Sequence, residues 1–357
     1  MWEPVVVTAT NLHAAVCAIV CRAGSSDVEA GLVADQLVEA NLTGHDSHGV
    51  GMMPRYAASL RAGTLRPDQH VSLVHDAGPL LTLDGNQGYG QVMGREAMEL
   101  GIARARVHGA AVVGLANTNH LGRIGHWAEQ CCRAGLVSIH FVSVLARPIV
   151  APWGGRDRRL GTNPFCVGVP RQDADPLILD FATARVPQGK TRVAYNRGEQ
   201  MAPGTLIDDR GEPTTDPRYT VVKPYGALLP MGEHKGYGLA LVCEILGSAL
   251  TGGETMHDGQ ERPYLRNGML TILIDPERME TAGNLAAEAA ALLDFVTASP
   301  PAEGVDRVLV PGEPERENRR ARLAAGIPID PTTWADVLDA AEQLGMPRAE
   351  LTPLAGL

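Results

Sequence analysis

The chain has 357 residues, of which 45% are apolar and 20% charged, and its formal net charge is −10. This acidic balance argues against nucleic acid or an anionic membrane surface as a partner, and an aromatic content of 4% argues against a base-stacking surface. The first residues lack the basic start and apolar core of a signal peptide. The six cysteines lie in apolar runs rather than at the spacings of a disulfide framework. We therefore expect a cytoplasmic protein with free thiols.

The first third of the chain has helical patterning. Thr10 or Asn11 is predicted to cap a helix that extends to about Arg22, and Ser25 or Ser26 is predicted to cap a second helix that extends to Leu42. The string "TGHDSHGVGMMPRY" follows beyond that helix. It contains two histidines, a serine and three glycines, and could in principle hold a metal, contribute to a hydrolase triad or orient a substrate.

The spacing of His45 and His48 permits chelation, but Gly44 and Gly49 interrupt any helix that would hold both ligands on one face. No third ligand follows at a zinc spacing, and Ser47 lacks the GxSxG elbow of a serine hydrolase. The sequence therefore favours a tight loop that presents Ser47 and His48 for hydrogen bonding, with no metal. A metal-dependent hydrolase that uses His45 and His48 is kept as an alternative.

From Pro79 the spacing of apolar residues changes, and it predicts a β-α-β unit. This unit has a strand over 79–85, a glycine-rich loop and helix over 86–109, and a strand over 110–117. The loop approaches the dinucleotide-binding fingerprint, but Met93 stands where the third glycine belongs and Gly94 comes one place late. The next strand ends in "NTNH" rather than in an acid that could bind a ribose. These departures exclude an ordinary Rossmann domain.

The remainder mixes strands and helices. The apolar run over 236–250 contains Glu244 and is too short for a membrane span, so it predicts a helix buried in the core. A long segment rich in proline, glycine and aspartate covers 185–231, and such a segment in a compact domain tends to be functional or interfacial. Strands are expected over 136–146, 165–170, 177–182, 269–275 and 307–311, and helices over 313–326 and 332–345. The pattern predicts an α/β fold with one large mixed sheet covered on both faces and helices at both chain ends.

Three positions combine reactive groups with the ends of predicted elements. His120 lies where a strand turns into a helix beginning near Gly122, and the positive helix end would lower its pKa and favour a neutral base. A histidine merely satisfied within a turn is the alternative there. Lys235 lies at a glycine-flanked helix start that suits a phosphate, although Glu233 and His234 beside it could be solvated surface groups. Asp180 ends an apolar strand, where it could face a ligand or cap a loop.

Together these motifs resemble the malate/L-lactate dehydrogenase-like family of NAD(P)-dependent oxidoreductases, which includes sulfolactate and ureidoglycolate dehydrogenases. The matching pieces occur in the family's order over about residues 40–320: "GHDSHGVGMMPRY", "NTNHLGRIG", "VAPWGG", "LGTNPF", "LDFAT", "PTTDP", "GEHKGYGLAL" and "VPGEPE". The resemblance implies a non-Rossmann, L-sulfolactate dehydrogenase-like fold and a homodimer. It also implies NAD or NADP as cofactor and a small 2-oxo or 2-hydroxy acid as substrate.

The resemblance also implies residue roles. His120 matches the proton-transferring histidine, Ser47 and His48 match the substrate-orienting pair, and Tyr56 matches a substrate contact. The positions that match the lining of the nicotinamide cofactor are Asn163, Asp180, Phe181, Ala182, His234, Lys235 and Gly236.

One position departs from the pattern. Many members carry an arginine four residues after the histidine, whereas this chain has Met52, as in the hydroxycarboxylate dehydrogenase B branch. Methionine cannot supply an arginine's bidentate grip on a carboxylate. Arg55, Arg123 or Arg147 could replace it, or the pocket could prefer a substrate with a larger, less polar side chain than malate or lactate.

We therefore expect a dehydrogenase that interconverts a 2-oxo acid and a 2-hydroxy acid, with His120 as proton donor or acceptor. Reduction of a cyclic imine of the piperideine-2-carboxylate type is the nearest alternative, and a non-catalytic ligand-binding descendant is another. The expected organisation is a helical domain from 1–75 with 312–357, a β-α-β segment at 76–120 that joins the lobes, and an NAD(P)-binding α/β domain at 121–311.

Overall fold

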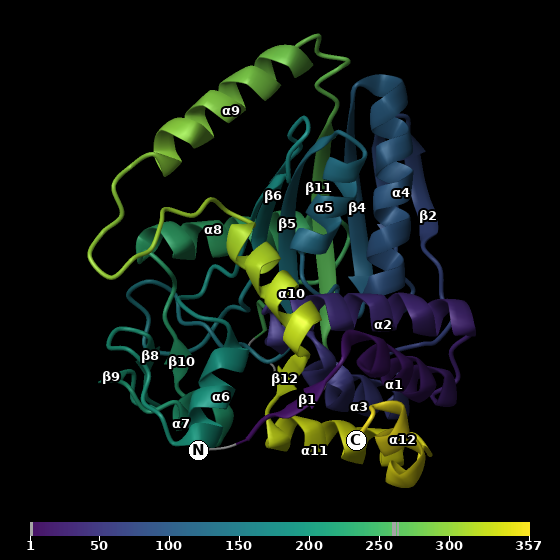
Figure 1. Cartoon of the computed structure of the whole chain (residues 1–357), viewed down its shortest axis with the longest axis vertical. Helices are drawn as coiled ribbons and strands as arrows, with labels where there is room; N and C mark the ends of the chain where they lie inside the picture. Colours follow the sequence, from purple (N-terminus) through teal and green to yellow (C-terminus); the bar gives the residue numbers. More distant parts are fainter. Residues whose placement is uncertain (1–2, 259–261, 263) are drawn as a thin grey trace.

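The computed structural model describes residues 3–258, 262 and 264–357, and its centre is a seven-stranded mixed sheet (Figure 1). In spatial order the strands are β2 (Ser72–Ala77), β3 (Leu80–Asp84), β4 (Ala110–Thr118), β11 (Arg266–Ile274), β5 (Val137–Leu145), β6 (Phe165–Val169) and β7 (Leu177–Phe181). Only β3 and β4 pair in parallel, because α4 (Gly90–His108) carries the chain back between them. The other neighbouring pairs are antiparallel. The expected mixed sheet is confirmed.

Helices cover both faces of this sheet. Successive side chains of a strand point to opposite faces. In β4, Val113 meets α4 at Gly101, while Gly114 faces Thr251, just beyond the π-helical turn η3 (Ile245–Ala249). The helix α5 (Gly125–Arg133) packs on β6, where Gly168 lies against Ala128. The helix α8 (His234–Glu244) runs directly into η3 and packs on β5.

A helical layer built from both chain ends lies below the sheet in Figure 1. The short strands β1 (Val5–Val7) and β12 (Ile327–Ile329) pair antiparallel, so the two ends share one core in which Leu12, Tyr56 and Trp334 are buried. Its helices are α1 (Ala9–Arg22), α2 (Asp27–Leu42), α3 (Met53–Arg61), α11 (Pro331–Gln343) and α12 (Arg348–Leu354). The helix α10 (Glu313–Ala325) packs on α2 and crosses the lower part of the sheet in Figure 1. The helical part from both ends is confirmed, whereas the exact domain boundaries stay a prediction.

The long segment over 185–231 forms a small lobe. It contains α6 (Gln188–Arg197), α7 (Arg218–Val221) and a three-stranded sheet of β8 (Leu206–Ile207), β9 (Pro213–Thr214) and β10 (Ala227–Leu228). Beyond the main sheet lies α9 (Ala282–Thr297), which buries none of its side chains. Its Leu292 and Phe295 are 60% and 80% exposed.

Three local predictions are wrong. The cap of α1 is Thr8, whose hydroxyl accepts from the backbone N–H of Asn11, so the helix begins at Ala9. Residues 307–311 form no strand, because Glu313 accepts hydrogen bonds from Arg307 and from the Val310 amide and makes this segment the lead-in to α10. The run over 236–250 is only partly buried, since Val242, Ile245 and Leu250 are exposed. Among the described residues, none of the helices combines the length and apolarity needed to cross a bilayer.

Candidate active site

His120 lies in the connection between β4 and α5, and its backbone is fixed from three directions. The Asn119 side-chain oxygen accepts from the amide of His120 at 2.9 Å, and Asn267 of β11 accepts from the amide of Leu121 at 2.9 Å. On the third side α4 packs so closely that a Cβ on Gly90 would lie 2.1 Å from the carbonyl oxygen of His120. The glycine-rich loop therefore brings a helix against the His120 backbone.

The His120 ring contacts one side chain at each nitrogen. Its Nε2 lies 3.0 Å from Nδ1 of His48, and its Nδ1 lies 2.8 Å from the hydroxyl of Tyr56. The two imidazoles are parallel, with ring centroids 5.2 Å apart. The structure thus brings together three of the predicted residues, which come from η1 (Asp46–His48), α3 and the β4–α5 connection.

Burial keeps this group of side chains uncharged. The pKa of His120 is well below its usual range, because the ring is buried and faces His48 and Arg55. Burial also lowers the pKa of His48 to about 4, with His45 and Arg123 adding to the shift, and raises the pKa of Tyr56. The expected direction for His120 is confirmed, but the cause is burial rather than a helix end, since α5 begins only at Gly125.

His45 points to a different place from His48. Its Nε2 lies 3.1 Å from a carboxylate oxygen of Glu315 in α10. The neighbouring Asp46 accepts from Arg322 at 2.6 and 3.0 Å and from Asn41 at 2.7 Å. The two histidines therefore do not converge on a common centre. Within the part of the chain that the structure describes, no three His, Cys, Asp or Glu side chains are grouped as metal ligands would be.

Ser47 lies beneath the lobe formed by 185–231. The first turn of α6 packs on it so tightly that a Cβ on Gly189 would lie 2.4 Å from the Cβ of Ser47. The same lobe reaches Arg147, whose guanidinium lies 3.9 Å above the ring of Tyr225 and donates to the carbonyl of Thr220 at 3.2 Å. This long segment therefore covers the histidine loop.

The three arginines proposed to replace the residue missing at Met52 have different surroundings. Arg123 is buried and donates to Glu129 at 2.7 Å, while Arg147 is held by the lobe as described. The Nε atoms of Arg55 and Arg123 are both buried and have no hydrogen-bond partner among the described residues. Burial, with Arg147 nearby, lowers the pKa of Arg55. Arg123 pairs with the Glu129 carboxylate, whereas Arg55 faces His120 with its Nε unused.

Most of the predicted cofactor residues lie at the end of β7 and at the start of α8. The Asp180 carboxylate accepts from the amide of Gly125 at 2.7 Å, and burial raises its pKa despite the nearby His45 and Arg123. Phe181 packs against Phe165, with centroids 5.9 Å apart, and Ala182 follows it at the end of β7.

The chain then meets the start of α8, because the amide of Met231 donates to the carbonyl of Thr183 at 2.9 Å. His234 and Lys235 are exposed in the first turn of α8, and no side chain caps this helix end. Gly236 is buried against the carbonyl of Met231.

Asn163 is used within the protein. Its side-chain oxygen accepts from the amide of Val144 at 3.0 Å, and its nitrogen donates to the carbonyl of Ala240 at 3.1 Å and to Glu244 at 2.8 Å. It therefore anchors α8 to β5, and a direct contact between Asn163 and a cofactor stays a prediction.

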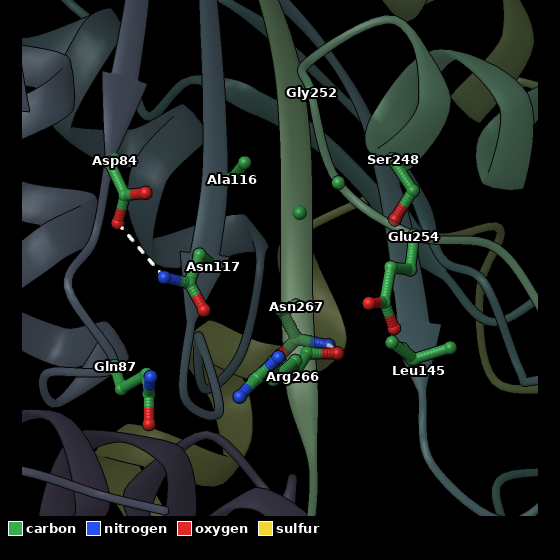
Figure 2. Close-up of a pocket in the computed structure, with 12 residues that line it drawn as sticks. Asp84, Gln87, Ala116, Asn117, Leu145, Ser248, Gly252, Glu254, Arg266 and Asn267 are labelled. Atoms are coloured by element: carbon green, nitrogen blue, oxygen red, sulfur yellow. Dashed lines mark hydrogen bonds between the residues drawn. The ribbon is translucent and has the colours of Figure 1, made fainter. Parts of the chain in front are cut away.

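A cavity of about 260 Å³ opens where β4, β5 and β11 meet, near the connection that carries His120 (Figure 2). Asp84, Asn117, Glu254 and Arg266 line it, and the amide of Asn117 donates to Asp84 at 3.0 Å. Asn267 also lines it and holds the backbone after His120. The cavity therefore borders the site without containing the histidines.

Three residues that shape the site were not predicted from the sequence. Gln91 of α4 donates to the hydroxyl of Tyr56 at 2.6 Å, Glu315 pairs with His45, and Asn267 supports Leu121. The motif "VPGEPE" pointed to the region of Glu315. No local signal marks Gln91 or Asn267, because their partners are distant in the sequence.

Comparisons with known proteins agree with this architecture. Residues 7–338 match the family model described as malate/L-lactate dehydrogenase. The chain is 50% identical over 346 residues to hydroxycarboxylate dehydrogenase B of Escherichia coli strain K12, covering 96% of this chain and 95% of that protein.

Solved structures show the same fold. A candidate malate/lactate dehydrogenase from E. coli superposes with a TM-score of 0.95 at 48% identity, covering 99% of both chains. Sulfolactate dehydrogenase from Methanocaldococcus jannaschii superposes with a TM-score of 0.85 at 32% identity, covering 96% of this chain and 98% of that one. A Δ1-piperideine-2-carboxylate reductase from Pseudomonas syringae is a more distant neighbour, with a TM-score of 0.79 at 28% identity, covering 95% of this chain and 99% of that one.

Proposed function

This chain belongs to the malate/L-lactate dehydrogenase family, and from that premise we propose that it interconverts a 2-oxo acid and a 2-hydroxy acid with His120 as the proton-transferring group. The observation that carries this proposal is the contact of His120 Nε2 with His48, 3.0 Å away, while Tyr56 occupies the other ring nitrogen. A buried imidazole with one nitrogen closed by a phenol can exchange a proton with a substrate only through the other nitrogen, so the substrate oxygen would have to take the place of His48 Nδ1 at Nε2.

A nicotinamide cofactor, when bound, supplies or accepts the hydride. In the reductive direction His120 gives a proton to the substrate oxygen at Nε2, and in the oxidative direction Nε2 takes that proton back. His48 lies on the Nε2 side, and we propose that it and Ser47, the preceding residue of η1, hydrogen-bond the same oxygen and fix its direction. His120 is only 7% exposed, so these hydrogen bonds would act in a low dielectric.

The residues along β7 and α8 fit a dinucleotide. No side chain caps the first turn of α8, and His234 and Lys235 are exposed there, so the positive end of the helix and the lysine together suit a diphosphate. Asp180, Phe181 and Ala182 lie between this helix end and the His120 connection, so they would hold the nicotinamide end. We propose NAD or NADP as the cofactor, bound without a Rossmann domain.

Arg55 is proposed as the group that binds the substrate carboxylate. Replacing Arg55 with leucine is expected to raise KM for the 2-oxo acid by about 10- to 100-fold, because a charged hydrogen bond contributes about 1.5–3 kcal/mol. Steady-state kinetics measure the effect, with Arg61→Leu at the exposed end of the same helix as the matched control. An equal change in KM for both variants would contradict the assignment.

The function itself is tested with a panel of 2-oxo acids and cyclic imines, each supplied with NADH and with NADPH, by following loss of reduced-nicotinamide absorbance. Turnover of at least one 2-oxo acid, faster than that of any imine, is the expected result. Faster turnover of a cyclic imine would assign the enzyme to the reductase class instead. Activity that requires a metal and disappears with a chelator would overturn the proposal.

A homodimer in the cytoplasm completes the proposal. The six free thiols suit a reducing compartment, and the exposed apolar side chains of α9 resemble an interface. Phe295→Glu is expected to convert dimer to monomer in light scattering, because it would bury a charge, while Asp294→Ala on the same helix leaves the mass unchanged. A dimer that persists in Phe295→Glu would exclude α9 from the interface.

A further inference from the structure

We propose that Gln91 is a positioning residue that acts through Tyr56 and allows the His120 ring to be either neutral or protonated. The inference rests on the proposed function, because it concerns how the proton-transferring histidine is supported. The side chain of Gln91 lies behind Tyr56, on the Nδ1 side of His120, whereas His48 lies on the Nε2 side.

The geometry is a chain of three buried groups from three elements. Gln91, in the first turn of α4, donates from Nε2 to the Tyr56 hydroxyl at 2.6 Å, and that hydroxyl lies 2.8 Å from Nδ1 of His120. Gln91 and Tyr56 are each 1% exposed. The side-chain oxygen of Gln91 is buried and has no partner within the described part of the chain. The Gln91 amide therefore lies next to the phenol with its nitrogen hydrogen-bonded and its oxygen free to accept a hydrogen bond.

The hydrogens of this chain can be assigned by counting. A phenol has one hydrogen to donate, and an amide side chain can both donate and accept. Because Gln91 donates to the phenol oxygen, the phenol hydrogen points to Nδ1 of His120. The His120 hydrogen is then on Nε2, where it is donated to Nδ1 of His48. Every hydrogen between Gln91 and His48 has an acceptor in this state.

Proton exchange at Nε2 requires the opposite direction of the chain. A ring with its hydrogen on Nε2 cannot accept a proton there, so Nδ1 must carry the hydrogen both when Nε2 is ready to take a proton and when the ring is protonated. Nδ1 then donates to the phenol oxygen, and the phenol hydrogen needs a different acceptor. Rotation of the Gln91 amide supplies its unpartnered oxygen for this purpose. A leucine at position 91 supplies no acceptor, and an unsatisfied buried hydroxyl disfavours the protonated state.

The charged and titratable groups that face His120 are few. They are His48 from η1 and Arg55 and Tyr56 from α3, and the positive charge of Arg55 opposes protonation of the ring. None of them is a carboxylate. A neutral amide that can reverse its direction is therefore the group behind Tyr56 that adapts to the proton on His120.

The test compares Gln91→Leu with Gln91→Glu by measuring kcat, KM and the pH profile of kcat/KM for the 2-oxo acid. Gln91→Leu is expected to lower kcat about tenfold with KM nearly unchanged, since a disturbed catalytic group lowers the rate rather than substrate binding. It should also shift to lower pH the part of the profile that is set by protonation of His120, called here the His120 limb. Gln91→Glu retains an acceptor, so its limb lies at higher pH than that of Gln91→Leu. Thermal unfolding and cofactor binding show whether each variant is folded.

The Tyr56→Phe background completes the test. There the Gln91→Leu change should have no further effect on kcat, because the connection to His120 is already absent. Coincident pH limbs for the two Gln91 variants, or a full Gln91→Leu effect in Tyr56→Phe, would overturn the inference. Failure of the proposed function is distinguishable, since the unmodified enzyme would then turn over no 2-oxo acid at all.

Discussion

Replacing His120 with alanine is expected to lower turnover by about 10²- to 10⁴-fold, which is the usual contribution of a positioned general acid or base. The loss should be this large because the ring is the group that connects His48 with Tyr56. Cofactor affinity should be nearly unchanged, since Asp180 and the start of α8 do not depend on the imidazole. Steady-state kinetics and cofactor titration by fluorescence measure the two quantities.

The pH dependence gives this prediction a second readout. Since burial holds the pKa of His120 well below its ordinary value, the ring is neutral near pH 7. Oxidation of the hydroxy acid should therefore be constant around neutral pH and fall only in acid, as the ring becomes protonated. His75→Ala on the exposed strand β2 is the matched control. A His120→Ala enzyme that kept its rate would refute the role assigned to this residue.

Gly90→Ala is expected to have the second large effect, without altering any proposed catalytic side chain. The added Cβ would lie 2.1 Å from the carbonyl oxygen of His120 and 2.7 Å from the Cα of Leu121, so backbone must move. Such overpacking costs about 1–3 kcal/mol, and movement of the His120 backbone should also lower turnover at least tenfold. Chemical denaturation and kinetics measure both consequences.

Gly31→Ala is the control for this substitution. Gly31 lies within α2 and has nothing within 4 Å of the position where a Cβ would be added. Alanine there should stabilise the protein by about 1 kcal/mol through helix propensity, with turnover unchanged. If Gly90→Ala behaved like Gly31→Ala, the close packing of α4 on the His120 connection would be disproved.

Elements with strong local signals were predictable from the sequence. Ser26 caps α2 and Gly109 ends α4, as their residue types indicate. The strand β2 could not be recognised, because all of its side chains are exposed and the apolar alternation of a half-buried strand is missing. Residues 307–311 have strand-like composition, yet the competing hydrogen bonds to Glu313 place them in a helix lead-in.

The candidate site was predictable as separate motifs but not as a geometry. His120 and His48 could be selected by residue type, whereas their contact joins positions far apart in the sequence. Gln91 lies in a loop that attracted attention for its glycines, and its own polar group has no local pattern. The sequence alone shows that Met52 stands where many family members have an arginine, and in the structure Met52 packs against the helical core. The unpartnered Nε of Arg55 could be identified only from the structure.

The pairing of β1 with β12 and the grip of Arg322 and Glu315 on the histidine loop have a consequence for synthesis on the ribosome. All seven strands of the main sheet have emerged before α10 is translated, so the sheet can form while the loop that contains His48 still lacks its anchors. The central sheet can therefore form before the histidine loop is held in its active position. A nascent chain that stalls before α10 would have a folded sheet but no dehydrogenase activity.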